Sequence, residues 1–255
     1  MAPITRRDFA ALAATVAFAP PALAQSADTG LLLRPIPSSG ERLPAVGLGT
    51  ASVFDNDGEK TQASAAQVIR TLIGAGGRLI DTASSYGDAE TVIGNALAAS
   101  GSRDKIFIAT KLEEPDQAEL QRSLARLKTA KLDLLQLHNV SDPKQSLAAF
   151  KQWKAEGICR YTGITSTFHR DFAALERVLQ REKPDFVQID YSVDDREAEK
   201  RILPMAAEVK AGVLTALPFG RGRLFRAVRG KELPDWVKGF AQSWAQLFLK
   251  FLLAD

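Results

Sequence analysis

Short apolar runs alternate with amphipathic stretches along most of the chain after its first 24 residues. Apolar runs bounded by turn residues are typical of buried strands, and apolar positions three and four residues apart indicate helices. The predicted strands are Val46–Thr50, Arg78–Ala83, Ile106–Lys111, Leu132–His138, Tyr161–Ser166, Phe186–Ser192 and Val213–Phe219. The predicted helices are Ala63–Ala75, Glu90–Ala99, Gln117–Leu127, Lys144–Glu156, Asp171–Gln180, Glu197–Lys210 and Trp236–Leu253.

Strict alternation of strand and helix predicts right-handed crossovers and an α/β fold with a parallel sheet. Seven such units, after a predicted hairpin at Leu31–Leu43, predict a (β/α)₈ TIM barrel whose eighth strand is missing from this chain. We therefore expect a truncated product or fragment, with a natural seven-stranded variant as the alternative. A doubly wound open sheet is the competing fold, but no Gly-x-Gly-x-x-Gly turn follows the first strand.

Residues 1–24 have the pattern of a targeting segment rather than of a folded element. Arg6 and Arg7 precede an apolar stretch, Phe9–Ala19, that is too short to span a bilayer, and Ala22–Ala24 has the A-x-A form of a cleavage site. The paired arginines resemble a twin-arginine signal. We expect a signal peptide over 1–24, recognition by the export machinery, a periplasmic location and a barrel domain over 25–255. No stable membrane insertion is expected after cleavage, and a buried N-terminal helix is the alternative.

Composition narrows the classes of function. The formal charge of +3 and the lack of a basic run argue against nucleic-acid binding. Because the chain has one cysteine, Cys159, it cannot form an intrachain disulfide. It has only two histidines, His138 and His169, which argues against a histidine-rich metal site. We interpret Cys159 as a packing residue and His169 as a loop residue at the mouth of the barrel.

Four polar residues fall at the ends of adjacent predicted strands, where a barrel of this type holds its chemistry. Asp81 and Tyr86 lie at and just past the second strand, Lys111 ends the third and His138 ends the fourth. A free phenol has a pKa of about 10, and a nearby ammonium favours its ionised form. We therefore expect Lys111 to lower the pKa of Tyr86, Asp81 to orient Lys111, and His138 to donate a hydrogen bond to a carbonyl.

Each of these residues also has a purely structural interpretation. Asp81 could be a buried partner of a core lysine, Tyr86 a loop aromatic and His138 a hydrogen-bonded structural histidine. Lys111 could be solvated, or could form a Schiff base in an aldolase-like lyase. Their occurrence together at the expected strand ends favours a catalytic group.

Three segments that carry these residues resemble the signatures of the aldo-keto reductases. They are Ile80–Gly87 (IDTASSYG), Ile108–Lys111 (IATK) and Asp133–His138 (DLLQLH). The resemblance implies a (β/α)₈ barrel and reduction of an aldehyde or ketone with NADPH, NADH not being excluded. It further implies that Tyr86 is the general acid, that Lys111 and Asp81 tune it, and that His138 orients a small-molecule carbonyl substrate.

The resemblance also suggests cofactor contacts. Ser166 and Gln188 match positions that hold the nicotinamide carboxamide, and the loop Pro218–Leu224 matches a segment along the pyrophosphate. Ala216 stands where the family often has a stacking aromatic, so Phe219 is expected to take that role. The predicted cofactor-binding residues are Gly49, Thr50, Ser166, Gln188, Pro218, Phe219, Gly220, Arg221 and Gly222. Gln188 as an interior polar residue, and a solvated basic loop, are the alternatives.

Three functions compete at this point. The intact tetrad favours an exported NAD(P)H-dependent carbonyl reductase. A non-catalytic module that binds nucleotide or a partner protein is the second hypothesis, because the family's adenosine contacts lie in and after the eighth strand. The Schiff-base lyase that uses Lys111 is the third.

Overall fold

The chain enters its fold through an antiparallel hairpin. The computed structural model describes residues 30–254, and the predicted signal peptide at 1–24 lies outside them. Strand β1 (Leu33–Pro35) pairs with β2 (Arg42–Pro44), as the turn residues between them predict. Ile36 and Leu43 of this hairpin are buried against residues inside the barrel, so the hairpin covers one end of it.

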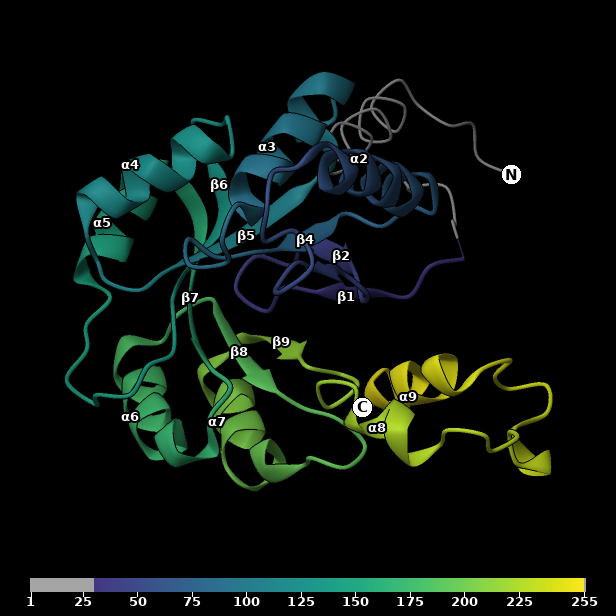
Figure 1. Cartoon of the computed structure of the whole chain (residues 1–255). Helices are drawn as coiled ribbons and strands as arrows, with labels where there is room; N and C mark the ends of the chain where they lie inside the picture. Colours follow the sequence, from purple (N-terminus) through teal and green to yellow (C-terminus); the bar gives the residue numbers. More distant parts are fainter. Residues whose placement is uncertain (1–29, 255) are drawn as a thin grey trace, which may run out of the picture. The chain divides into compact units, whose positions relative to one another are not determined.

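Seven parallel strands follow and curve into a nearly closed barrel (Figure 1). They are β3 (Leu48–Gly49), β4 (Leu79–Asp81), β5 (Phe107–Leu112), β6 (Leu132–Leu137), β7 (Cys159–Ser166), β8 (Phe186–Asp190) and β9 (Gly212–Ala216). Each strand pairs with the next in sequence order, which is the order of a barrel and not of a doubly wound sheet. Within residues 30–254, no ladder joins β9 back to β3.

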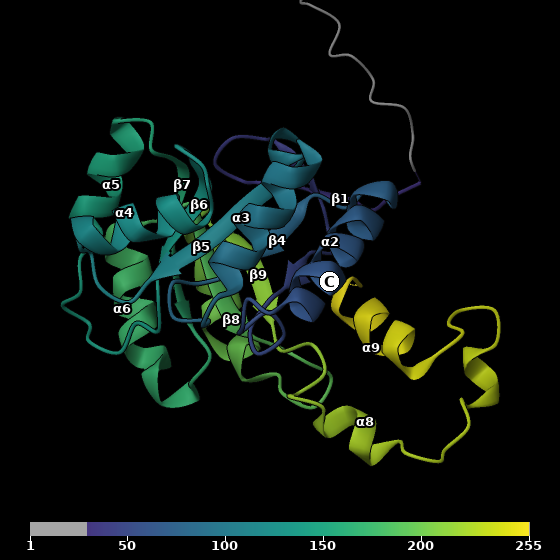
Figure 2. The same cartoon turned by 45° about the horizontal axis from the view of Figure 1, so that its top comes forward.

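Helices cover the outer face of the sheet (Figures 1 and 2). They are α2 (Glu59–Gly74), α3 (Ala89–Ser100), α4 (Gln117–Arg126), α5 (Ala148–Ala155), α6 (Phe172–Glu182) and α7 (Ile202–Val209). Two more helices, α8 (Arg223–Ala227) and α9 (Trp244–Leu252), follow β9 and lie to one side of the others in Figure 1. Helices α5 and α6 pack on β7, and α7 packs on β9. In this part of the chain, none of the helices has the length and apolar character that crossing a bilayer requires.

Strand alternation divides the buried apolar residues into two cores. One core fills the barrel and includes Phe107, Ala109 and Leu134. The larger core, which includes Ile80, Ile108 and Leu135, lies between the sheet and the helices. Two buried layers around one sheet hold the strand ends in fixed positions.

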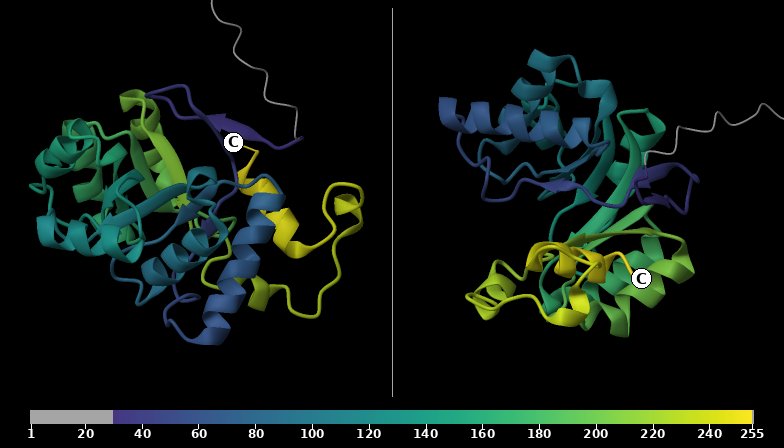
Figure 3. Two further views of the ribbon diagram at one scale, coloured as in Figure 1. Left: turned by 90° about the horizontal axis from the view of Figure 1, so that it is seen from above. Right: turned by 90° about the vertical axis from the view of Figure 1, so that its right-hand side faces the viewer.

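The last predicted helix, Trp236–Leu253, is wrong in its first half. Gly239 has φ +81°, a left-handed conformation that breaks a helix, and Ser243 then caps α9 by accepting a hydrogen bond from the Gln246 backbone N–H. Before that break lies a short 3₁₀ turn, Asp235–Val237, in the yellow loop that Figure 3 shows. The Trp236 side chain in this turn is exposed. The predicted helix Glu197–Lys210 is likewise divided, into a 3₁₀ turn (Glu197–Lys200) and α7.

Candidate active site

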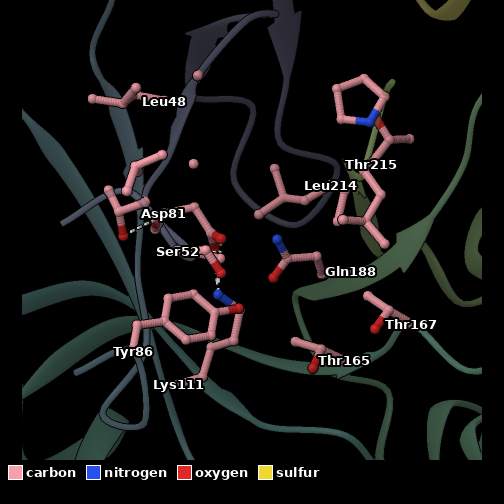
Figure 4. A pocket seen from close by; sticks show the side chains of 18 of the residues that line it. Leu48, Ser52, Asp81, Tyr86, Lys111, Thr165, Thr167, Gln188, Leu214 and Thr215 are labelled. Carbon is pink, nitrogen blue, oxygen red and sulfur yellow. Dashed lines mark hydrogen bonds and ion pairs between the residues drawn. The ribbon is translucent and has the colours of Figure 1, made fainter. Parts of the chain in front are cut away.

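A cavity of about 900 Å³ opens at the carboxyl ends of the strands. All four residues of the predicted catalytic group, Asp81, Tyr86, Lys111 and His138, line it. Figure 4 shows Asp81, Tyr86 and Lys111 together on one side, with Gln188 facing them across the cavity. The strand ends thus bring together residues that lie up to 57 positions apart in the chain.

Lys111 is held rigidly by its neighbours. Its Nζ donates hydrogen bonds to both carboxylate oxygens of Asp81, at 2.9 and 2.8 Å, and to the backbone oxygen of Thr82 at 2.7 Å. An ammonium has three N–H donors, so these contacts engage all of them. A Schiff-base lysine must present a free amine to its substrate, and this arrangement does not favour that role.

Tyr86 lies beside this ion pair. Lys111 Nζ is 5.1 Å from the centre of the Tyr86 ring, and the ring meets His138 edge to face at 5.7 Å between ring centres. Burial raises the pKa of the Tyr86 hydroxyl more than Lys111 lowers it. Lys111 thus acts in the expected direction, but burial outweighs it, so the pKa is raised overall and the phenol stays protonated at neutral pH.

His138 follows β6 and contacts a residue that the sequence analysis missed. Its Nδ1 lies 2.5 Å from Glu113 Oε1, and Ser85 Oγ donates to the same oxygen at 2.6 Å. Burial lowers the pKa of the His138 ring, and the hydrogen bond to Glu113 opposes this only in part. Glu113 comes two positions after Lys111, so the two-residue period of a strand would place it on the same face as Lys111. A single glutamate after a strand, outside any motif, did not otherwise mark it as a site residue.

Seven of the nine predicted cofactor residues line the same cavity. They are Gly49, Thr50, Gln188, Pro218, Phe219, Arg221 and Gly222. Ser166 does not: strand alternation turns it away, and the preceding residue Thr165, whose register partner is Gln188, lines the cavity instead. Gly220 does not line the cavity either, since its N–H closes a turn onto Leu217.

The loop after β9 combines positive charge with a curled backbone. Leu217, Gly220, Arg221 and Gly222 all have positive φ, between +52° and +78°. Such values are costly for residues other than glycine and often mark functional loops. Arg223 pairs with Asp194 at 2.5 Å, whereas Arg221 lines the cavity and makes no ion pair with any residue the structure describes.

Two further expectations concern residues outside this group. Cys159 is buried at the start of β7, and burial raises the pKa of its thiol to about 12, so it is a packing residue. His169 is partly exposed, and its Nε2 lies 3.3 Å from a carboxylate oxygen of Asp190 and 3.0 Å from one of Asp195. Among residues 30–254, these three side chains are the one group whose ligand atoms lie close enough together for a cation, within 4.8 Å.

Known proteins resemble this chain in sequence and structure. An aldo-keto reductase of Mycolicibacterium smegmatis is 37% identical over 133 residues, which are 48% of this chain and 44% of that protein. One from Mycobacterium avium is 31% identical over 194 residues, 72% of this chain and 64% of the relative. The chain thus matches less than two thirds of the length of these relatives.

Solved structures give the same picture. An aldo/keto reductase from Klebsiella pneumoniae, in complex with NADP and acetate, superimposes with a TM-score of 0.69 at 26% identity, covering 85% of this chain and 79% of the other. The holo form of an aldo-keto reductase from Bacillus halodurans superimposes with a TM-score of 0.66 at 26% identity, covering 88% and 76%. The model of the aldo/keto reductase family matches residues 45–246, so this chain belongs to the aldo/keto reductase family.

Proposed function

We propose that this protein reduces an aldehyde or ketone to the alcohol with the nicotinamide cofactor NADP(H), and that Tyr86 supplies the proton. One observation carries the proposal. A protonated phenol, a lysine held by a carboxylate, and a histidine line one cavity at the carboxyl ends of the strands. Family membership and the NADP-bound relative support it.

The residues present suit a nicotinamide nucleotide. The cavity volume lies at the upper end of the range typical of ligand pockets, about 300–1,000 Å³. Gln136 Nε2 donates to Gln188 Oε1 at 3.0 Å, which leaves the Gln188 NH₂ group for a carboxamide oxygen. At the other end, Arg221 lines the cavity and offers positive charge to phosphates. Phe219 lines the cavity and is the ring available for stacking.

When bound, a reduced nicotinamide supplies the hydride that adds to the carbonyl carbon. The chain's own residues bind and protonate the carbonyl oxygen. Tyr86 donates its phenolic proton to that oxygen as the C–O π bond breaks, which completes the alcohol, and solvent then restores the proton. Lys111 stabilises the phenolate formed in this step, and Asp81 keeps the lysine charged and in place.

The oxidation of NADPH with a panel of aldehydes and ketones tests this proposal, with absorbance at 340 nm as the readout. Tyr86→Phe should lower kcat by about 100-fold or more and leave NADPH binding nearly unchanged, because only the proton donor is lost. Tyr161→Phe is the matched control: its hydroxyl contacts Ser39 and Glu41 in the hairpin, away from the cavity. Full activity in the Tyr86 variant would remove Tyr86 from the mechanism. NADPH binding without any turnover would favour the non-catalytic module.

We further propose that residues 1–24 direct export to the periplasm after the cofactor has been acquired in the cytoplasm. The proposal rests on Arg6, Arg7 and the A-x-A sequence at Ala22–Ala24. Cell fractionation should find the protein in the periplasm, and replacing both arginines with lysine should retain it, uncleaved, in the cytoplasm. An unchanged distribution would contradict a twin-arginine signal.

A further inference from the structure

The loop that carries Tyr86 is fixed at Ser84 by three hydrogen bonds. The backbone N–H of Ser84 donates to the backbone oxygen of Lys111 at 3.0 Å, and the backbone oxygen of Ser84 accepts from Arg126 Nη1 at 3.2 Å. The Ser84 hydroxyl donates to Glu119 Oε1 at 2.5 Å. Arg126 and Glu119 both belong to α4, so this helix holds the loop from the outside of the barrel.

The Glu119 carboxylate also holds the loop that follows β5. The backbone N–H of Glu113 donates to its Oε1 at 3.1 Å, and that of Glu114 donates to its Oε2 at 3.3 Å. Hydrogen bonds to a carboxylate are about twice as strong as those between neutral groups. One half-buried side chain therefore ties together the loops that follow β4 and β5.

These two loops lie next to the proposed proton donor and its lysine. The Tyr86 N–H donates to the backbone oxygen of Ala83 at 3.1 Å, so Tyr86 closes a tight turn that begins one residue before Ser84. Lys111 ends two residues before Glu113, and its Nζ lies 5.1 Å from the centre of the Tyr86 ring (Figure 4). A shift of one loop against the other would change that separation.

We propose that Glu119 is a positioning residue for the proposed carbonyl reduction: it holds the loop after β4 against the loop after β5, and so keeps the Tyr86 phenol in place beside Lys111. The inference rests on the proposed function, in which Tyr86 supplies the proton. Glu119 is not among the residues that line the cavity, so it acts through the loops and not on the substrate. Such effects can be large, because misplacing a reacting group by about 1 Å can cost about 100-fold in rate.

Steady-state kinetics test the role of Glu119. Glu119→Ala removes the acceptor of all three donors, so kcat should fall about tenfold while the KM values for NADPH and the carbonyl stay within about twofold, because the cavity lining is unchanged. Glu119→Gln keeps an oxygen that can accept from Ser84 and Glu113 and should restore most of kcat. An unchanged kcat in Glu119→Ala, or a Gln variant as slow as the Ala variant, would contradict the proposal.

Gln117→Ala is the matched control on the same helix. Gln117 Oε1 accepts a hydrogen bond from Trp153 Nε1 of α5 at 2.8 Å, so its loss weakens the packing of α4 without touching either loop. This variant should have a lower melting temperature and the kcat of the wild type. A fall in kcat that follows the melting temperature in both variants would show that Glu119 serves only the stability of α4, and would overturn the proposal.

Hydrogen exchange measures the loop without any turnover. In the full-length protein, backbone N–H groups in a peptide spanning residues 82–88 should exchange about tenfold faster in Glu119→Ala than in the wild type, because local opening becomes easier. Gln117→Ala should leave this exchange unchanged. Unchanged exchange in Glu119→Ala would overturn the proposal. Absence of turnover with every carbonyl in the wild type would instead reject the proposed function and with it the catalytic role, while the exchange result would still decide whether Glu119 fixes the loop.

Discussion

Lys111 Nζ donates to both carboxylate oxygens of Asp81, at 2.9 and 2.8 Å, and the lysine side chain is only 2% exposed. The two residues come from neighbouring strands, β5 and β4, so the sheet itself sets their separation. A buried ammonium needs a partner, because transfer of an unpaired charge from water into the protein interior is costly. The ion pair therefore serves both the fold and the proposed chemistry.

Asp81→Asn should impair both stability and activity. The variant leaves the buried charge of Lys111 without its carboxylate, which should cost about 3–5 kcal/mol of unfolding free energy. The freed lysine should no longer stabilise the Tyr86 phenolate in a fixed geometry, so kcat should fall about 100-fold. Urea unfolding and steady-state kinetics, performed well below the melting temperature of the variant, measure the two effects separately.

A surface ion pair provides the control for this loss. Glu182 pairs with Lys151 at 2.8 Å, but the lysine side chain is 49% exposed, so Glu182→Gln should cost at most about 1 kcal/mol and leave kcat unchanged. Equal losses of stability in the two variants would show that the charge of Lys111 does not need the Asp81 carboxylate to be stable in the folded protein.

Arg221→Gln should weaken binding of NADPH by about tenfold, equivalent to about 1.4 kcal/mol. Arg221 lines the cavity, and Gln keeps most of its length while removing the charge that would meet a phosphate. The difference should shrink as salt rises, because added ions screen an exposed charge. Fluorescence titration with NADPH gives the dissociation constants. Arg226→Gln removes a charge outside the cavity lining and should change affinity little; equal effects would contradict a direct role of Arg221.

The sequence predicted the fold well wherever the apolar pattern was strong. All seven predicted strands correspond to observed strands whose ends shift by no more than three residues, since a buried strand must be apolar on both faces. The first strand is shorter, Leu48–Gly49, because few apolar residues mark it. The apolar run at Trp236–Leu253 misled the helix prediction, since its pattern does not register the left-handed turn at Gly239.

The part of the candidate site that lies at strand ends could be predicted, because the strands themselves could be predicted. Asp81, Lys111 and His138 meet because parallel strands bring their carboxyl ends to one mouth. Two features were out of reach. The net pKa of Tyr86 depends on how much solvent the folded chain removes, and the partner of His138 depends on where the side chain of Glu113 turns after β5 ends. Both are properties of three-dimensional packing.

Glu90 makes a prediction about stability and pH. This carboxyl, on α3, is 1% exposed and accepts a hydrogen bond from Thr110 Oγ1 at 2.7 Å. Burial raises its pKa above the ordinary 4.5, even though hydrogen bonds and Arg126 oppose the shift. The folded state therefore holds a proton that the unfolded state releases, so wild-type stability falls as pH rises from 4.5 through the raised pKa.

Glu90→Gln removes this titration and keeps a side-chain oxygen for Thr110. The difference in melting temperature, variant minus wild type, should therefore grow more positive between pH 4 and pH 7, as scanning calorimetry can measure. Glu182→Gln should show the opposite slope. Burial raises the pKa of Glu182, but hydrogen bonds from Lys151 and Arg181 outweigh this and lower it, so the wild-type carboxylate gains stability with rising pH. A difference for Glu90→Gln that falls with pH would show that Glu90 is ionised in the folded state because its partners outweigh its burial.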